Sequence, residues 1–337
     1  MVDEKIIIAS SASVALLIAY CFNCLWSAIF YIGLVRLLLF YSSVAHFINK
    51  FFIRKRLNLI KRYGDGSYAL VTGGANGIGL EYAIQLAEAG FNIIILDLSD
   101  ELLQKAKEKI LEKAPKADVV MKVRNLCEMT KQEHYEEFMD EVKEYDISVL
   151  VNNAGVADYH QFHETTPASV SRTIQVNAIA VLGFTRMFYT KFMNREKKGG
   201  IINMASGVGL ASNSLVPIYP STKAFVKYLT EGLQEECKGK IDLLYIYPGA
   251  VTTSATAFRV APDSTTPDVI ARNALNSLGQ DGYNAGYWLH DIFCSQVEAM
   301  FYCNRELYRF VEDAAVEKTG LGKDLRNIAK DQDKKNK

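Results

Sequence analysis

The chain begins with a long apolar segment and continues with shorter apolar runs that alternate with charged stretches. From Ile6 to Val35 there is no Asp, Glu, Lys, Arg or His. A helix needs about 20 apolar residues to cross the hydrocarbon core of a bilayer. A secretory signal would have a shorter apolar region, and a mitochondrial transit peptide would lack the acidic start. The pattern therefore predicts a membrane-spanning helix.

Basic residues follow this segment and predict its orientation. Arg36 and six further Lys or Arg side chains precede the next acid, Asp65. Basic flanks favour the cytosolic side of a membrane, so we expect the chain after about residue 50 to be cytosolic. The stretch Leu37–Ile48 is again apolar, and a second helix lying in the membrane interface is one interpretation of it. Residues 1–62 are thus expected to form a membrane anchor with a basic juxtamembrane segment.

The rest of the chain alternates apolar runs with amphipathic stretches. Helical patterns cover about 80–89, 100–112 and 221–236. Such alternation is typical of a parallel sheet with helices on both faces. Strands buried on both faces are continuous apolar runs, and six runs fit: Tyr68–Thr72, Phe91–Leu96, Val119–Val123, Asp146–Val151, Ile201–Met204 and Ile241–Ile246. The predicted fold is α/β, a doubly wound parallel sheet of Rossmann type over residues 63–305, with a charged tail at 306–337.

The amino-acid composition of the chain excludes one class of binding partner. The chain has 38 basic and 38 acidic side chains, so its formal net charge is zero. Nucleic-acid binding needs a basic excess, so no nucleic-acid partner is predicted. The six cysteines give no disulfide framework and are expected to be reduced thiols. No metal site is predicted, because His160 and His163 beside Glu164 have no further ligand set nearby.

A glycine cluster directly after the first predicted strand indicates a dinucleotide site. Glycines at 73, 77 and 79 allow a tight turn and close approach of a pyrophosphate to the N-terminus of the next helix. Asp97 ends the second strand, where a carboxylate accepts hydrogen bonds from the adenosine ribose and repels a 2′-phosphate. The two residues after it are not basic. The sequence therefore predicts NAD as cofactor, with NADP as the alternative.

Tyr219 and Lys223 lie four residues apart in a helical stretch and share one face. A free tyrosine has a pKa near 10 and is a poor base at neutral pH. An ammonium about 4 Å away contributes roughly 4 kcal/mol at an effective dielectric of 20, which is about three pKa units. Tyr219 could then exchange a proton with an alcohol or a carbonyl, while Ser206 holds the substrate oxygen. Pro220 places Tyr219 near the helix start.

In order and spacing, these motifs resemble the short-chain dehydrogenase/reductase family over about residues 66–300. The motifs are Thr72-Gly73-x-x-x-Gly77-Ile78-Gly79, Asn152-Asn153-Ala154-Gly155, Ser206, Tyr219-x-x-x-Lys223 and Pro248-Gly249. The resemblance implies the catalytic residues Asn177, Ser206, Tyr219 and Lys223, with Asn177 holding a water that relays the proton. It implies a dinucleotide site that comprises Thr72, Gly73, Asn76, Gly77, Ile78, Gly79, Asp97, Asn125, Leu126, Asn152, Ala154, Gly155, Tyr219, Lys223, Pro248, Gly249, Val251 and Thr253.

A narrower resemblance concerns the membrane segment, the stretch Ser206–Phe225 and the stretch Thr266–Tyr287. They look like the steroid 17β-dehydrogenase and very-long-chain 3-oxoacyl-CoA reductase branch. That branch implies an anchor in the endoplasmic reticulum membrane, a cytosolic catalytic domain and hydrophobic ketone or alcohol substrates. Lys334-Lys335-Asn336-Lys337 is similar to a dilysine retrieval signal. Asp97 departs from the branch, whose acyl-CoA reductases favour NADPH.

The sequence predicts a membrane-anchored oxidoreductase that interconverts a hydroxyl and a ketone on a steroid or a 3-oxoacyl-CoA. Its expected partners are the lipophilic substrate and membrane lipid, with a homo-oligomer or a membrane complex as further options. A mitochondrial membrane is the alternative location. The alternative function is a non-catalytic accessory subunit that keeps a bound dinucleotide within a membrane complex.

Overall fold

The computed structural model describes residues 4–157, 162–212, 216–253 and 263–319. The chain divides into two compact units, Met1–Arg54 and Lys55–Lys337. His160 and the expected retrieval signal Lys334–Lys337 lie outside the described residues. Residues 55–62, expected in the juxtamembrane segment, fall within the second unit.

The first unit is one long helix, α1 (Glu4–Ile48), followed by a π-helical turn, η1 (Asn49–Ile53). The helical span Tyr20–Ile53 is long and apolar enough to cross a membrane, with a mean hydropathy of 1.8 and no burial within its most apolar part. The interpretation of Leu37–Ile48 as a separate interfacial helix is wrong, because α1 runs through it without a break. The reason is local: this stretch contains neither Gly nor Pro to end a helix.

The second unit is a seven-stranded parallel sheet with the order β3-β2-β1-β4-β5-β6-β7. Its strands are β1 (Tyr68–Thr72), β2 (Asn92–Asp97), β3 (Val119–Val123), β4 (Ile147–Asn152), β5 (Gly199–Met204), β6 (Ile241–Ile246) and β7 (Tyr283–Asn284). Its helices are α2 (Leu59–Tyr63), α3 (Gly77–Glu88), α4 (Asp100–Lys113), α5 (Gln132–Glu141), α6 (Pro167–Ile174), α7 (Ala180–Met193), α8 (Ile218–Cys237), α9 (Pro267–Ser277), α10 (Trp288–Cys303) and α11 (Arg305–Thr319), with short turns η2 (Phe162–Glu164), η3 (Gln175–Ile179) and η4 (Gly207–Gly209).

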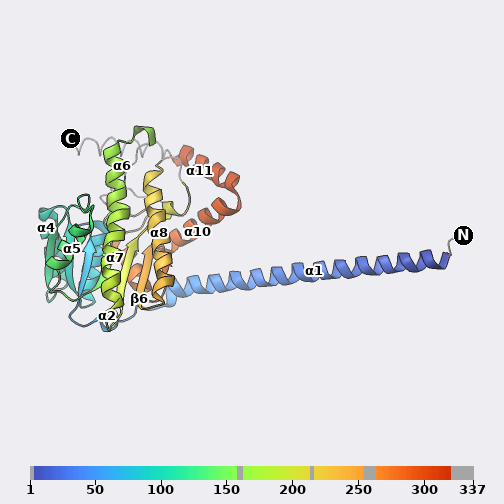
Figure 1. The fold of residues 1–337 in the computed structure, drawn as a ribbon, viewed down its shortest axis with the longest axis horizontal. Helices are drawn as coiled ribbons and strands as arrows, with labels where there is room; N and C mark the ends of the chain where they lie inside the picture. The colour runs from blue at the N-terminus through green and yellow to red at the C-terminus, as the bar shows by residue number, and fades with distance from the viewer. Residues whose placement is uncertain (1–3, 158–161, 213–215, 254–262, 320–337) are drawn as a thin grey trace. The chain divides into compact units, whose positions relative to one another are not determined.

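Helices cover both faces of the sheet, as the apolar runs predict. On one face, Val71, Ile93 and Ile95 pack against α2, α3, α4 and α9. On the other face, Leu70 and Ile94 pack against α5 and α7, and α7 runs beside α8 (Figure 1). Successive residues of one strand thus pack into two different cores. For this reason these strands show no regular alternation of apolar and polar residues.

The strand order reverses between β1 and β4, which lie side by side in the middle of the sheet. The loops that leave their carboxyl ends diverge to opposite faces, and ligands of open α/β sheets bind in the crevice between such loops. The predicted fold class is confirmed, and the glycine cluster lies at this switch point.

Two elements differ from the sequence-based expectation. Strand β7 has only two residues, too few to form an apolar run, and was not predicted. Residues 306–319, expected in a charged tail, form most of helix α11. Tyr308 of α11 is almost fully buried, and its hydroxyl donates to the carbonyl of Ser212 at 2.5 Å. One aromatic anchor therefore holds this charged helix against the domain.

The segment before β1 is tied to β6 by a partly buried ionic contact. Asp242 accepts hydrogen bonds from Nε and Nη2 of Arg62 at 2.5 and 2.9 Å and from the Tyr63 hydroxyl at 2.8 Å. Burial alone would raise the pKa of Asp242, but these hydrogen bonds outweigh it and hold the pKa below its ordinary value. The resulting stabilisation is present above the ordinary carboxyl pKa and is lost as the pH falls through the lowered value.

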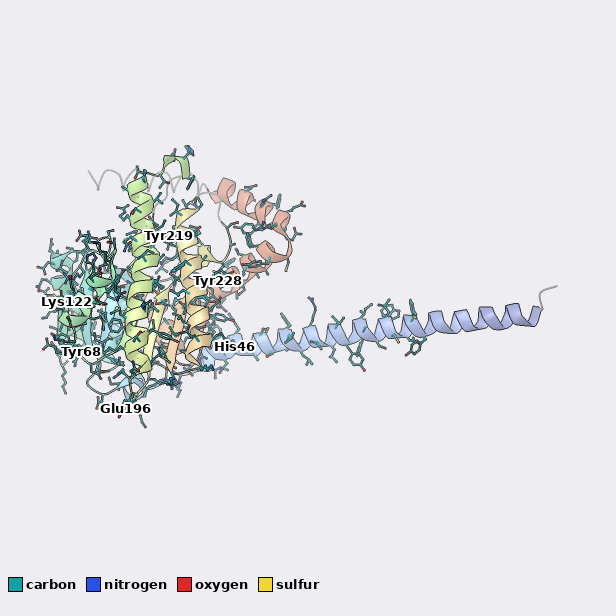
Figure 2. The ribbon with its side chains drawn as sticks, viewed as in Figure 1. His46, Tyr68, Lys122, Glu196, Tyr219 and Tyr228 are labelled. Carbon is teal, nitrogen blue, oxygen red and sulfur yellow. The ribbon has the colours of Figure 1, made fainter. Side chains whose placement is uncertain are left out.

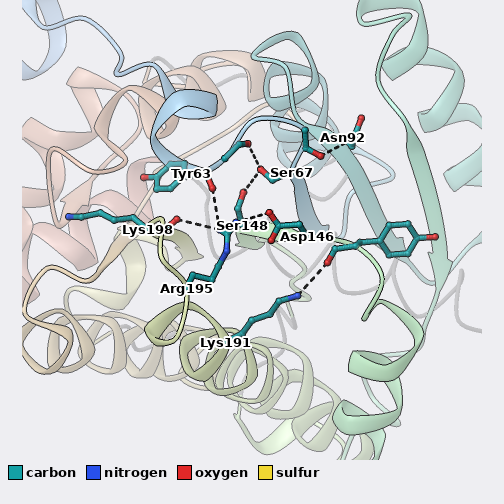
Figure 3. Close-up of polar contacts among 11 residues, drawn as sticks. Tyr63, Ser67, Asn92, Asp146, Ser148, Lys191, Arg195 and Lys198 are labelled. Carbon is teal, nitrogen blue, oxygen red and sulfur yellow. Dashed lines mark hydrogen bonds and ion pairs between the residues drawn. The ribbon is translucent and has the colours of Figure 1, made fainter.

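A second set of contacts holds the same segment from the side of β4 and α7 (Figure 3). Arg195 donates to the carbonyl of Tyr63 at 3.2 Å and to the carboxylate of Asp146 at 2.7 Å. The hydroxyls of Ser67 and Ser148 are buried and hydrogen-bonded to each other at 2.6 Å. The chain entering the sheet is therefore part of the domain and not a loose linker.

Two truncations test this boundary. A chain that starts at Lys55 lacks the apolar helix and should leave the membrane fraction on carbonate washing while it unfolds cooperatively in urea. A chain that starts at Tyr63 also loses the buried Leu59 and the Arg62–Asp242 contact, and should be less stable by about 3–5 kcal/mol. As a control, Lys105→Ala in the longer chain removes only an exposed pair with Glu101 and should leave stability unchanged. Equal stability of the two truncated chains would contradict the assignment of residues 55–62 to the folded domain.

Candidate active site

The glycine loop connects β1 to α3 and depends on the absence of side chains at three positions. Gly73 and Gly77 have positive φ angles of 64° and 55°, which other residues rarely adopt. A Cβ at Gly79 would lie 2.1 Å from the carbonyl oxygen of Gly73. The side chain of Asn76 caps α3 by accepting from the N–H of Gly77 at 2.7 Å. The loop thereby brings the positive end of α3 to the switch point.

The loop after β4 locks onto the glycine loop. The hydroxyl oxygen of Thr72 accepts from the backbone N–H groups of Asn153 and Ala154, each at 3.1 Å. The amide of Asn153 donates to the carbonyls of Thr72 and Gly73, also at 3.1 Å. A Cβ at Gly73 would lie 2.8 Å from Cα of Ala154. The two loops thus form one rigid base beneath the crevice.

Asp97 at the end of β2 is oriented by backbone N–H groups. One carboxylate oxygen accepts from Ala75 of the glycine loop at 3.1 Å, and the other accepts from Leu98 at 2.7 Å. Arg124 follows β3 on the neighbouring strand, where its backbone N–H donates to the carbonyl of Asp97 and its guanidinium pairs with Glu141. A fixed carboxylate and a paired guanidinium therefore lie at the same end of the crevice.

A cavity of about 530 Å³ opens above the carboxyl ends of the strands. Most of the predicted site residues line it: Gly73, Asn76, Gly77, Ile78, Asp97, Asn125, Leu126, Ala154, Gly155, Ser206, Tyr219, Lys223, Pro248, Gly249, Val251 and Thr253. The sequence analysis missed further lining residues, among them Arg124, Cys127, Arg172 and Met204. Arg124 could have been found, because it directly follows a predicted strand and therefore lies at the carboxyl edge; Arg172 lies in a helix and carries no such signal.

Four predicted residues support the cavity without lining it: Thr72, Gly79, Asn152 and Asn177. Thr72 and Gly79 join the two loops, as described above. The amide of Asn152 donates to Thr185 at 3.0 Å and to Asn203 at 2.8 Å, and Asn203 donates to Thr230 at 3.0 Å. All four side chains of this network are buried. Asn152 therefore joins β4 to β5 and to the helices α7 and α8.

Tyr219, labelled in Figure 2, and Lys223 lie in the first turns of α8, and both line the cavity. The helix begins at Ile218, so Pro220 occupies its first turn and needs no N–H donor there, as the sequence predicts. Nζ of Lys223 lies 5.6 Å from the centre of the Tyr219 ring and donates to the carbonyl of Met204 at 2.8 Å. Burial lowers the pKa of Lys223 to about 8. The pair thus brings a phenol and a poorly solvated amine to one wall.

Asn177 lies in η3, a π-helical turn between α6 and α7. Its amide oxygen accepts from the N–H of Val156 at 2.8 Å, and its amide nitrogen donates to the carbonyl of Val156 at 2.7 Å and to the Thr222 hydroxyl at 3.3 Å. A Cβ at Gly155 would lie 3.4 Å from the Asn177 oxygen and 3.5 Å from Nζ of Lys223. Asn177 and the Lys223 amine therefore both lie next to Gly155, and Asn177 belongs to a type of turn that is frequent at functional sites.

Ser206 follows β5 and faces the same cavity. Its hydroxyl lies 3.5 Å from the carbonyl of Pro248, which also accepts from the N–H of Gly207 at 2.9 Å. Ser206, Tyr219 and Lys223 thus reach one cavity from the end of β5 and from α8. A hydroxyl donor, a phenol and an ammonium around one space can hold a carbonyl oxygen and deliver a proton to it.

Comparison with known proteins agrees with this geometry. Residues 67–263 match the family model for short chain dehydrogenases. A very-long-chain 3-oxoacyl-CoA reductase of Danio rerio is 31% identical over 79% of this chain and 86% of its own length. A Caenorhabditis elegans protein provisionally named steroid dehydrogenase 2 is 29% identical over 87% of this chain and 96% of its own length.

Solved structures give the same result. A short-chain dehydrogenase from Sphingobium yanoikuyae in complex with NADPH matches with a TM-score of 0.57 and 26% identity, covering 63% of this chain and 84% of that one. The family model covers more than half of the chain, and it spans both the glycine loop and the Ser206, Tyr219 and Lys223 cluster. The chain therefore belongs to the short chain dehydrogenase family and is a nicotinamide-dependent oxidoreductase.

Proposed function

We propose that this enzyme interconverts a ketone and a hydroxyl on a lipophilic substrate, with a 3-oxoacyl-CoA or a steroid as the substrate class. The observation that carries the proposal is the convergence of Ser206, Tyr219 and Lys223 on one cavity with the glycine loop. The named activities of the similar Danio rerio and Caenorhabditis elegans proteins support the choice of substrate. The long apolar helix α1 supports a membrane location, where such substrates concentrate.

The residues of the cavity divide into binding and proton-transfer groups. The glycine loop, Asp97, Asn125 and Leu126 would hold the adenosine and pyrophosphate parts of a nicotinamide dinucleotide, and Pro248, Gly249, Val251 and Thr253 its other end. The cofactor supplies the hydride chemistry when bound. Ser206 would hold the substrate oxygen, and Tyr219 would exchange its phenolic proton with that oxygen. Lys223 would lower the pKa of the Tyr219 phenol, and Asn177 would hold a water that relays the proton.

The proposed anchor would keep the catalytic unit at the cytosolic face of the endoplasmic reticulum membrane. The basic residues after the apolar segment, such as Arg54 and Arg56, support this orientation. The name of the very-long-chain reductase described above supports a role in lipid metabolism.

The first test is Tyr219→Phe. The change keeps the ring and removes the proton carrier, so turnover of a 3-oxoacyl-CoA or steroid panel by the detergent-solubilised full chain should fall at least about 1,000-fold. Dinucleotide affinity, followed by quenching of protein fluorescence, should change less than about threefold. Substantial residual turnover would contradict the role of Tyr219. A wild-type chain that binds dinucleotide but turns over none of the panel would favour a non-catalytic dinucleotide-binding subunit.

Lys223→Met should separate function from stability. The change should abolish turnover and weaken dinucleotide binding, because it removes a cation of the site. It also removes an amine whose pKa is lowered by burial from 10.5 to about 8. Such a group opposes folding while it is charged in the folded state, so the wild type becomes relatively more stable as the pH rises from 8 to 10.5.

We therefore expect the variant without cofactor to be at least as stable as the wild type at pH 7. Any advantage of the variant should shrink between pH 8 and 10.5. Urea unfolding at several pH values measures both. A wild type that is more stable at pH 7, with no change in the difference at higher pH, would contradict a desolvated Lys223.

The cofactor preference should follow Asp97. At about 4 Å and an effective dielectric of 20, each pair of like charges costs roughly 4 kcal/mol, and counterions reduce this. We propose a preference for NADH over NADPH of about tenfold to a thousandfold, or roughly 1.4–4 kcal/mol. Asp97→Ser combined with Leu98→Arg should reverse the preference, because it removes the repulsion and adds a phosphate partner.

Titration of wild type and variant with NADH and NADPH measures this preference. Tighter NADPH binding by the wild type would contradict it and would assign the 2′-phosphate to Arg124, the lining cation beside Asp97. In that case Arg124→Gln should remove the preference for NADPH. The experiment therefore distinguishes a preference set by Asp97 from one set by Arg124.

A further inference from the structure

His290 is buried in the first turn of α10 and uses both ring nitrogens. Nδ1 accepts a hydrogen bond from the backbone N–H of Gly249 at 3.1 Å, and Nε2 lies 2.9 Å from the carbonyl oxygen of Asp263. A backbone N–H can only donate, so Nδ1 carries no proton, and Nε2 must carry one to donate to the carbonyl. The ring is therefore neutral and in a single tautomer. Burial favours the same state, since it lowers the pKa of His290.

The two groups that His290 holds lie at the two ends of one segment. Next to these two groups, the N–H of Thr252 donates to the carbonyl of Thr265 at 2.9 Å, and the N–H of Thr265 donates to the carbonyl of Ala250 at 3.2 Å. These bonds close the base of the segment, and the imidazole fastens that base to α10. The ring also packs tightly, because a Cβ at Gly249 would lie 2.8 Å from Cδ2 of His290.

The same part of the chain is fixed from its other side by the loop that carries Ser206. The carbonyl of Pro248 accepts from the N–H of Gly207 at 2.9 Å and lies 3.5 Å from the Ser206 hydroxyl. Pro248, Gly249 and Ser206 line the cavity, whereas His290 does not. Any displacement of Gly249 therefore moves one cavity wall and the acceptor of Ser206 together, and His290 can influence the chemistry only through them.

We propose that His290 is a positioning residue that holds Gly249, and through Pro248 the Ser206 hydroxyl, in the geometry needed for turnover. This rests on the proposed function, in which Pro248 and Gly249 form the nicotinamide end of the site. The bond to Gly249 matters for catalysis, and the bond to Asp263 matters mainly for holding the ring in place.

Two substitutions separate the two bonds. In His290→Asn the amide oxygen occupies about the position of Nδ1 and can still accept from Gly249. In His290→Gln the amide nitrogen reaches about the position of Nε2 and can still donate to Asp263, but the N–H of Gly249 loses its acceptor. We expect kcat of His290→Gln to fall at least about tenfold while KM for the dinucleotide changes less than about threefold. His290→Asn should retain kcat within about threefold.

His134→Gln is the matched control. Nδ1 of this half-exposed histidine also accepts from a backbone N–H, that of Thr130 at 3.2 Å, but neither residue lines the cavity. Its kcat should equal that of the wild type. Thermal unfolding of all variants shows whether they fold. Equal losses of kcat in the Asn and Gln variants, or none in either, would overturn the proposal.

Amide hydrogen exchange of the full chain in detergent gives a readout that needs no substrate. Exchange at Gly249 should be about tenfold faster in His290→Gln than in the wild type, and nearly unchanged in His290→Asn. Unchanged exchange in both variants would overturn the proposal whatever the substrate. Absent turnover by the wild type, in contrast, would count against the proposed function, because the exchange result stands independently of it.

Discussion

The close approach of two loops at the switch point is the constraint on which the site depends. Gly79 packs against the carbonyl of Gly73, and Asn153 and Thr72 exchange hydrogen bonds across the gap between β1 and β4. Any side chain at Gly79 would push the loops apart, because its Cβ would lie 2.1 Å from the carbonyl oxygen of Gly73 and 2.4 Å from the amide nitrogen of Asn153. The cavity above them keeps its shape because its base is made of backbone groups held by short side chains.

The fold could be predicted because its strands are buried on both faces. Runs such as Ile93–Leu96 have no polar position, and glycine follows the first run at once. Strand β7 could not be predicted, because two residues carry no periodicity, and its place depends on pairing with β6. The continuity of α1 was missed for a different reason. The basic Arg36 interrupts the apolar pattern without interrupting the helix, since a charged residue does not break helical geometry.

The candidate site likewise contains residues that the sequence predicts and residues that it does not. Residues that follow a strand, such as Asp97 and Ser206, are brought together by the rule that parallel strands end at one edge. The support that orients them could not be read from spacing, because its members come from distant parts of the chain. Asn152 and Asn203 are joined only when β4 and β5 pair, and His290 meets Gly249 only when α10 packs beside the end of β6. Residues that support the site from distant parts of the chain leave no motif in the sequence.

The π-helical turn at Gln175–Ile179 affects how this chain can tolerate changes in length. A π-turn holds one residue more than an α-helical turn, so the side chains before and after it are out of phase by about 100° relative to an unbroken α-helix. On α7 this phase turns Phe184, Phe188 and Phe192 into the core, and at the turn itself it aims Asn177 at Val156. Loss of a single codon within the turn would give a more regular helix. It would also rotate either the aromatic face or the asparagine away from its contacts, so this helix should accept substitutions more readily than deletions.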